Sequence, residues 1–195
     1  MDIFDADDKS TPLSADEKQG LKLDWVTLRS ELNEIEAGNI AQAHMWLLSC
    51  KSADIYSDRF LRILHKKMFN QVWSWAGKYR TTEKNIGAAP ELIPIKLMQL
   101  FHDVKFWVEN RTYDSREIAV RFHHRLVQIH PFPNGNGRVS RLMDDLVFRN
   151  LEGKPLYWGN TDLVHISDTR NKYIAALRKA DAGDYTELIA FTKEK

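Results

Sequence analysis

The chain has 195 residues, and its 28 basic and 27 acidic side chains leave a formal net charge of +1. This length suits one domain with a full core, and the charge balance excludes the overall basic excess of a nucleic-acid-binding protein. The single cysteine, Cys50, excludes an intrachain disulfide and a zinc site built on thiolates. Because the N-terminus lacks the pattern of a secretory signal and no apolar run could span a bilayer, we expect a cytoplasmic protein without a membrane partner.

Apolar side chains at helical spacing predict a mainly α-helical protein. Ser14-Ala15-Asp16-Glu17 has the pattern of a capping box that opens a short helix. The stretch from Leu21 to Cys50 predicts two helices that separate near Gly38, and the stretch from Ser57 to Val72 predicts a third. Trp75 to Gly87 differs, because it combines β-type residues with glycines, and it predicts a short β-hairpin or an extended flap.

The second half of the sequence predicts five more helices. They run from about Pro94 to Glu109, from Ser115 as the cap to His130, from the glycine-rich turn to Gly153, from Ser167 to Ala180, and onward from Asp184. The second of these has a buried stripe of Ile118, Phe122, Leu126 and Ile129. The third has a buried stripe of Val139, Leu142, Met143, Leu146 and Val147.

The run from His130 to Arg141, His-Pro-Phe-Pro-Asn-Gly-Asn-Gly-Arg-Val-Ser-Arg, carries the strongest chemical pattern. Gly135 and Gly137 allow consecutive amides to point the same way, and the helix that follows has unpaired N–H groups suited to an anion. Arg138 and Arg141 are three residues apart, so both guanidinium groups can reach a phosphate from nearly one helix face. His130 has a pKa that suits a general base near pH 7. The pattern predicts a phosphate-transfer site.

Each part of this run also has an ordinary structural explanation. A His-Pro pair often ends a helix, a Gly-x-Gly turn is common, and arginines on a helix surface are usually solvated. The occurrence of all these parts, in this order, within twelve residues favours the phosphate-transfer site over the structural explanations. The adjacent His123 and His124 cannot share a helix face, so we expect surface histidines rather than metal ligands acting with Asp144 or Asp145.

The run resembles the signature of the Fic (Fido) family, His-x-Phe-x-Asp/Glu-Gly-Asn-Gly-Arg-x-x-Arg, at every fixed position except Asn134. Trp75-Ala76-Gly77-Lys78-Tyr79-Arg80 resembles the family's approach to its target-docking flap, and Tyr173 with the Gly183-Asp184 turn resembles its C-terminal helices. The resemblance covers about residues 55–192. It implies a helical fold with a small β-hairpin flap, and transfer of AMP from Mg-ATP to a Ser, Thr or Tyr hydroxyl of a target protein.

The resemblance also implies roles for individual residues. His130 would activate the target hydroxyl, while Gly135, Asn136 and Gly137 would form the anion hole over the phosphates. Arg138 would hold the inner leaving phosphates, and Arg141 would hold the terminal phosphate. The flap residues would pair with the target chain as an added strand; they are Thr82, Lys84, Asn85, Ile86 and Gly87.

Asn134 stands where most active members of the family have a carboxylate for Mg²⁺. An amide oxygen can coordinate Mg²⁺ but contributes no charge, so we expect weak metal binding. Asparagine here also resembles the Doc branch, whose members transfer a terminal phosphate as kinases. Because Gly137 and Arg141 are kept, the resemblance favours nucleotidyl transfer. A Doc-like kinase, transfer of another nucleotide, and a weakly catalytic nucleotide-binding interaction protein remain the alternatives.

The N-terminal segment suggests regulation. Many Fic proteins carry a Ser/Thr-x-x-x-Glu-Gly/Asn helix that misplaces the terminal phosphate, and Ser30 with Glu34 fits this pattern except at Ile35. Glu36 is the neighbouring candidate, and a solvated helix face is the alternative explanation. We therefore expect residues 1–54 to form an N-terminal arm with a regulatory segment and residues 55–195 to form the catalytic core. The N-terminal segment also resembles mobile mystery protein B, whose genes accompany a helix-turn-helix partner in a toxin–antitoxin-like pair.

Overall fold

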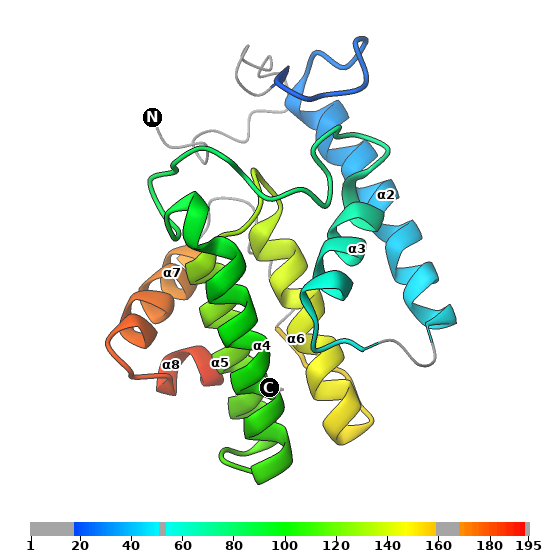
Figure 1. Ribbon diagram of the computed structural model, residues 1–195. Helices are drawn as coiled ribbons and strands as arrows, with labels where there is room; N and C mark the ends of the chain where they lie inside the picture. The colour runs from blue at the N-terminus through cyan, green and yellow to red at the C-terminus, as the bar shows by residue number, and fades with distance from the viewer. Residues whose placement is uncertain (1–17, 51–53, 159–167, 194–195) are drawn as a thin grey trace. The chain divides into compact units, whose positions relative to one another are not determined.

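The computed structural model describes residues 18–50, 54–158 and 168–193 (Figure 1). This part of the chain is mainly helical. Its helices are α2 (Arg29–Ser49), α3 (Asp58–Phe69), the 3-10 helix η1 (Pro90–Leu92), α4 (Ile93–Asn110), α5 (Ser115–Ile129), α6 (Asn136–Glu152), α7 (Asp168–Asp181) and α8 (Thr186–Ala190). The capping box expected at residues 14–17 lies outside the described residues.

The chain forms two compact units. One combines Met1–Asp54 with Arg59–Lys78, and the other combines Ile55–Asp58 with Tyr79–Lys195. The functional division into a regulatory segment and a catalytic core near residue 54 stays a prediction. No helix in the described ranges is both long enough and apolar enough to cross a membrane.

In the first unit, α2 is one continuous helix, so the predicted break near Gly38 is wrong. A side chain at Gly38 would meet nothing within 4 Å, so this glycine lies on an open face. Polar anchors on either side of it fix the helix. The indole Nε1 of Trp73 donates to Glu36 at 2.5 Å, and Asn39 bonds the backbone of Lys67 and Gln71, each at 3.0 Å. These contacts outweigh the helix cost of one glycine, which is about 1 kcal/mol.

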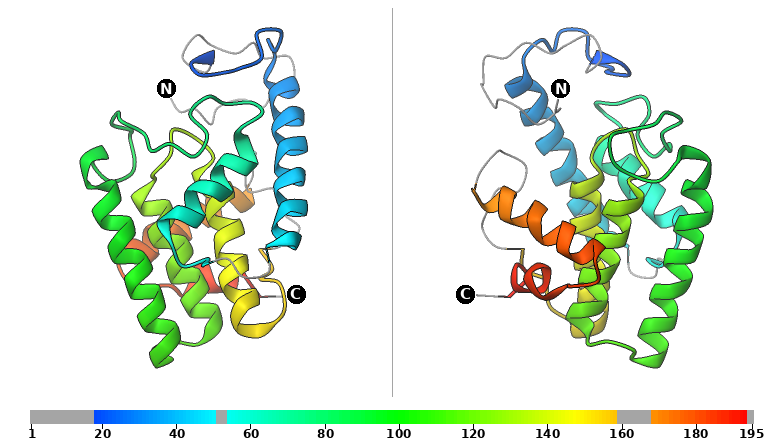
Figure 2. Two further views of the ribbon diagram at one scale, coloured as in Figure 1. Left: turned by 45° about the vertical axis from the view of Figure 1, so that its right-hand side comes forward. Right: turned by 90° about the vertical axis from the view of Figure 1, so that its left-hand side faces the viewer.

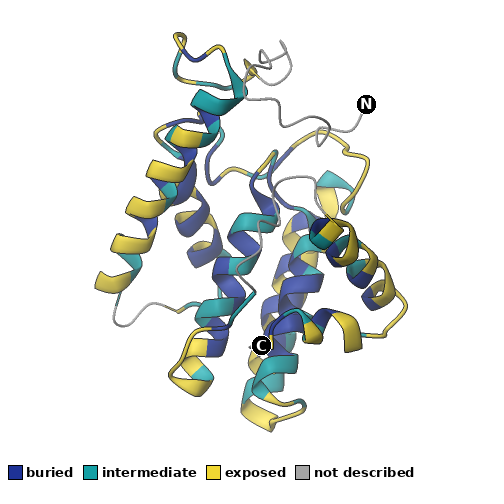
Figure 3. Cartoon of the chain, turned by 180° about the vertical axis from the view of Figure 1, so that it is seen from behind, coloured by how far each residue is buried: buried dark blue, intermediate teal, exposed yellow. Residues whose placement is uncertain are grey.

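The second unit is built around α5, which packs against α4, α6 and α8 (Figure 2). The predicted stripe on α5 is fully buried, and so are Val139, Leu142, Met143 and Val147 of the stripe on α6, while Leu146 is half-buried. Buried faces are dark blue in Figure 3. Asp114 rather than the predicted Ser115 caps α5, because its carboxylate accepts from the amide of Glu117 at 2.8 Å. α7 and α8 add a cluster of Val120, Tyr173, Ala176, Ala180 and Leu188.

The predicted β-hairpin flap does not form within the described residues. The segment from Thr81 to Ala88 has no strand, and the one β-bridge in the described ranges joins Leu21 to Trp73. Hairpin pairing would need the carbonyls of this segment for a ladder. Instead the Arg80 guanidinium binds the carbonyls of Thr82 and Ala88, and the segment closes as an extended loop.

Candidate active site

The glycine-rich loop between α5 and α6 is held by one buried amide. Oδ1 of Asn136 accepts from the Phe132 amide at 2.9 Å, and Nδ2 donates to the Phe132 carbonyl at 2.8 Å. Asn136 is only 2% exposed, and Phe132 is fully buried. Both ends of the Asn136 side chain are therefore occupied, so it shapes the loop instead of donating to a phosphate. This use of Asn136 is one that the sequence pattern does not reveal.

The loop leads directly into the N-terminus of α6. Gly135 has a φ of 77°, a left-handed conformation that favours glycine, and the amide of Val139 makes the first helical bond to its carbonyl at 3.0 Å. The amides of the preceding turn therefore have no acceptor within the helix, and the helix dipole adds positive potential. A side chain at Gly137 would lie 3.6 Å from Nη1 of Arg141. Gly137, in the first turn of α6, therefore lies close to the Arg141 guanidinium, and the use of this turn as an anion site stays a prediction.

His130 ends α5 on the other side of the loop. Its φ is 52°, and its amide caps the helix by donating to the carbonyl of Leu126 at 3.1 Å. Nδ1 is buried, so a substrate hydroxyl would have to approach Nε2. Burial and then the charges of Arg80 and Lys84 lower the pKa of His130 to about 4, against a smaller opposing effect of the Val127 backbone. The imidazole is therefore neutral at pH 7, the form that accepts a proton, but its pKa lies below the value near 7 that was expected from the sequence.

This shift predicts the titration of His130. Because its pKa is lowered, the neutral form persists as the pH falls below 6.5 and is lost only near pH 4. The substitution Lys84→Met removes one of the charges that lower this pKa, so the midpoint should move upward toward 6.5. Titrating the C2 proton of His130 by NMR in both proteins measures this. A midpoint near 6.5 in the unaltered protein would contradict the burial of the ring.

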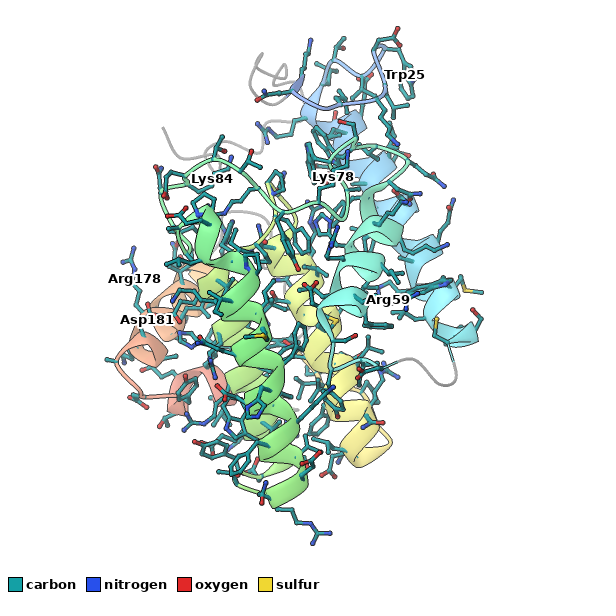
Figure 4. The ribbon with its side chains drawn as sticks, viewed as in Figure 1. Trp25, Arg59, Lys78, Lys84, Arg178 and Asp181 are labelled. Carbon is teal, nitrogen blue, oxygen red and sulfur yellow. The ribbon has the colours of Figure 1, made fainter. Side chains whose placement is uncertain are left out.

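The predicted flap residues are all solvent-exposed: Thr82, Lys84, Asn85, Ile86 and Gly87. Lys84 is labelled in Figure 4. Ile86 is 54% exposed, which is unusual for a large apolar side chain. A side chain at Gly87 would come within 2.7 Å of Cβ of His130, so this end of the flap lies against the histidine turn. The structure therefore brings the flap and His130 together.

A buried polar cluster between α5, α6 and α7 was not predicted. Nδ1 of His123 lies 2.5 Å from Oδ2 of Asp144, and its Nε2 lies 2.7 Å from the Tyr173 hydroxyl. The indole of Trp158 donates to Asp144 at 3.1 Å. Burial lowers the pKa of His123 and raises those of Asp144 and Tyr173, so it favours the uncharged form of each group. Arg141 acts on all three as a charge and hydrogen-bonds Tyr173.

The prediction that His123 and His124 lie on the surface is therefore wrong. His123 is fully buried, and His124 is 3% exposed. His124 contacts Asp181 at 2.9 Å and the Tyr185 hydroxyl at 3.2 Å. The two adjacent histidines point to different partners, as neighbours on a helix must, and each is satisfied by its own tyrosine. The tyrosines come from α7 and the turn before α8, which local sequence spacing cannot reveal.

The described residues offer little to a metal ion. Asn134 is exposed, and its Oδ1 accepts from the Gly135 amide at 2.7 Å. No group of three or more His, Cys, Asp or Glu side chains in the described ranges could hold a metal. A neutral amide oxygen fits a Mg²⁺ ion that is bound mainly by nucleotide phosphates, but it does not fit a metal held by the protein alone.

The candidate inhibitory residues lie on α2 in the other compact unit. Ser30 is half-buried and Glu34 is exposed, while the neighbouring Glu36 is buried against Trp73. The Glu36 carboxylate is therefore occupied by a structural hydrogen bond within its own compact unit. The assignment of Ser30 and Glu34 as an inhibitory pair stays a prediction.

The glycine-rich loop, the N-terminus of α6 and His130 together have the arrangement expected of a phosphate-transfer enzyme. Residues 56–147 match the model of the Fic/DOC family, so this chain contains a Fic/DOC family domain. It is 29% identical over 148 residues to protein adenylyltransferase fic-1 of Caenorhabditis elegans, covering 74% of this chain and 28% of that protein. It is 30% identical over 146 residues to protein adenylyltransferase Fic of Nematostella vectensis, covering 72% of this chain and 32% of that protein. The chain thus spans 28–32% of the length of these curated relatives.

Solved structures show the same fold. The N-terminal Fic domain of Bep8 from Bartonella sp. 1-1C has a TM-score of 0.67 at 14% identity, over 86% of each chain. BepC from Bartonella tribocorum, solved with bound AMPPNP, has a TM-score of 0.65 at 18% identity, over 90% of this chain and 94% of that one. These similarities confirm the predicted mainly α-helical Fic-like fold.

Proposed function

We propose that this protein is a protein adenylyltransferase that transfers AMP from Mg-ATP to a Ser, Thr or Tyr hydroxyl of a target protein. The observation that carries the proposal is the position of His130 at the end of α5, beside a glycine-rich loop that Asn136 holds at the N-terminus of α6. The Asn136 bonds and the Arg80 bonds hold these two parts, so the site needs little rearrangement to act. The adenylyltransferase names of the matched relatives support the same reaction.

The chemistry follows from the positions of the groups. Nε2 of His130 accepts the proton of the target hydroxyl as the hydroxyl oxygen bonds to the α-phosphorus. The bond from the α-phosphorus to the bridging oxygen breaks, and pyrophosphate leaves with that electron pair. The amides of Asn136 and Gly137 stabilise the phosphate charge, because the Gly135 amide already donates to Asn134. Arg138 and Arg141 hold the leaving phosphates. Mg²⁺, when bound with ATP, neutralises phosphate charge, and Asn134 would be its one protein ligand from this loop.

The flap is the part of the site that binds the second substrate, the target protein. Its exposed residues 82–87 can align a target chain beside His130, because a side chain at Gly87 would touch that residue. We infer that the target binds as an added strand along the flap, with main-chain pairing supplying affinity. This alignment places the target hydroxyl for in-line attack.

ATP labelled on either the α- or the γ-phosphate tests the proposal. The protein is incubated with a cell lysate and each form of ATP. Adenylyl transfer moves only the α label to protein, whereas a Doc-like kinase moves only the γ label. If neither label moves, and His130→Ala makes no difference, the nucleotide-binding interaction protein becomes the better account.

The weak metal ligand gives a separate prediction. Asn134→Asp adds a charged oxygen where the resemblance places Mg²⁺, so half-maximal transfer should need roughly tenfold less Mg²⁺. The measurement is the initial rate of α-label transfer against Mg²⁺ concentration at fixed ATP. Asn110→Asp adds the same charge to an exposed residue at the C-terminal end of α4 and serves as the control. Equal Mg²⁺ dependence in all three proteins would remove Asn134 from the metal site.

We also propose the narrower assignments that the resemblance implies. In these assignments the protein belongs to the mobile mystery protein B group and is cytoplasmic. Its partner is a helix-turn-helix protein, and the two form a toxin–antitoxin-like module. In this proposal the partner, and not this chain, contacts nucleic acid. The near balance of 28 basic and 27 acidic side chains supports the assignment of nucleic-acid binding to the partner.

A further inference from the structure

Arg80 is a buried cation at the start of the flap, only 3% exposed. Its Nε donates to the carbonyl of His130 at 2.7 Å, Nη1 donates to the carbonyl of Thr82 at 2.9 Å, and Nη2 donates to the carbonyl of Ala88. Its own amide donates to the carbonyl of Pro131 at 2.9 Å. One side chain therefore ties both ends of the flap to the turn that carries His130.

The backbone completes this joint on the other side of the flap. The amide of Ala88 donates to the carbonyl of Ile129 at 3.1 Å. Gly87 has a φ of 108°, and a Cβ there would lie 2.7 Å from Nη2 of Arg80 and 2.7 Å from Cβ of His130. Only a residue without a side chain fits between the guanidinium and the histidine. The joint thus consists of Arg80, Gly87, Ala88 and the residues 129–131.

The chemistry of Arg80 suits this task. A guanidinium has five N–H donors in a rigid planar fork, so it can satisfy carbonyls that point from three directions. A lysine ammonium is a single flexible point and cannot span the same acceptors. Hydrogen bonds from a charged donor are also stronger than those between neutral groups.

We propose that Arg80 and Gly87 are positioning residues, which join the target-docking flap to the His130 turn as one rigid piece. A target chain seated on residues 82–87 is then aligned with Nε2 of His130 without a separate closing movement. This inference rests on the proposed function, because it assigns the flap to the target and His130 to the hydroxyl. It extends that function by naming the parts that hold base and target in register.

Gly87→Ala is the variant that tests the joint, and Gly183→Ala is its matched control. Gly183 has a φ of 91°, so alanine is strained at both positions, but a Cβ at Gly183 would meet nothing within 4 Å. In Gly87→Ala we expect amide hydrogen exchange at Ala88 to become about tenfold faster or more. We also expect kcat for α-label transfer to fall about tenfold or more, with ATP affinity unchanged. Gly183→Ala should change none of these quantities.

Arg80→Lys keeps the charge and removes the fork, and it should accelerate exchange at Ala88 in the same way. Unchanged exchange at Ala88 in folded Gly87→Ala overturns the joint. Faster exchange with an unchanged kcat overturns its role in positioning. If the unaltered protein transfers no α label, the proposed function fails, while the exchange measurements still decide whether the joint exists.

Discussion

His130→Ala is expected to reduce AMP transfer by roughly 10² to 10⁴-fold, the usual contribution of a general base. The imidazole is neutral at pH 7, because burial and nearby cations lower its pKa to about 4. Removing it leaves the target hydroxyl without a proton acceptor, while the loop amides and arginines stay in place. ATP affinity should therefore change less than about twofold, because the imidazole is not part of the anion site.

The measurements are the initial rate of α-label transfer and the ATP dissociation constant by calorimetry. His102→Ala is the matched control, because this histidine lies on α4 with a side chain that is 82% exposed. It should leave both quantities unchanged. Full transfer by His130→Ala would show that another group takes the proton.

Asn136→Ala should have the second large effect, on stability and on transfer together. It removes the two bonds that Asn136 makes to the amide and carbonyl of Phe132, and each such loss costs about 1–3 kcal/mol, so we expect roughly 2–6 kcal/mol in total. The loop then loses the shape that aligns its amides, and transfer should fall by roughly 10²-fold or more. Urea denaturation and the rate of α-label transfer measure the two effects.

Asn39→Ala provides a control of matched geometry in the other compact unit. Asn39 is also 2% exposed, and it also bonds one backbone amide and one carbonyl, those of Gln71 and Lys67. Its loss should destabilise the fold by a similar amount. Under conditions in which both variants are folded, only Asn136→Ala should lose transfer. Equal loss of transfer in both variants would show that the effect comes from stability alone.

The local pattern was sufficient for much of the helical core, while the anion site that it indicates stays a prediction. The stripes on α5 and α6 repeat at three and four residues, and a single helix face is all that such a pattern specifies. The order of His130, the glycines and the arginines indicated a phosphate site because these parts are adjacent in the chain. Helix dipoles and left-handed glycines act over about one helical turn, so a short stretch of sequence is enough to predict this loop.

The failures have other causes. His123 was predicted to lie on the surface because its partners, Tyr173 and Asp144, are on other helices and are not visible in the local sequence. The hairpin was predicted from β-type residues, but Arg80 claims the carbonyls that a ladder would use. Asn136 was assigned to the anion hole, whereas its side chain bonds the amide and carbonyl of Phe132. For His123 the deciding contacts come from distant residues, whereas for the hairpin and Asn136 they lie within eight residues but depend on side-chain geometry that a residue pattern does not specify.

The Arg80 guanidinium binds the flap through main-chain carbonyls. Arg80 binds the carbonyls of Thr82, Ala88 and His130, and every residue type has a carbonyl. The side chains of residues 83–86 take no part in these bonds, so they are free to change without loosening the catalytic geometry. Such a scaffold can acquire new targets by exchanging a few exposed side chains, while the alignment of the base is inherited intact.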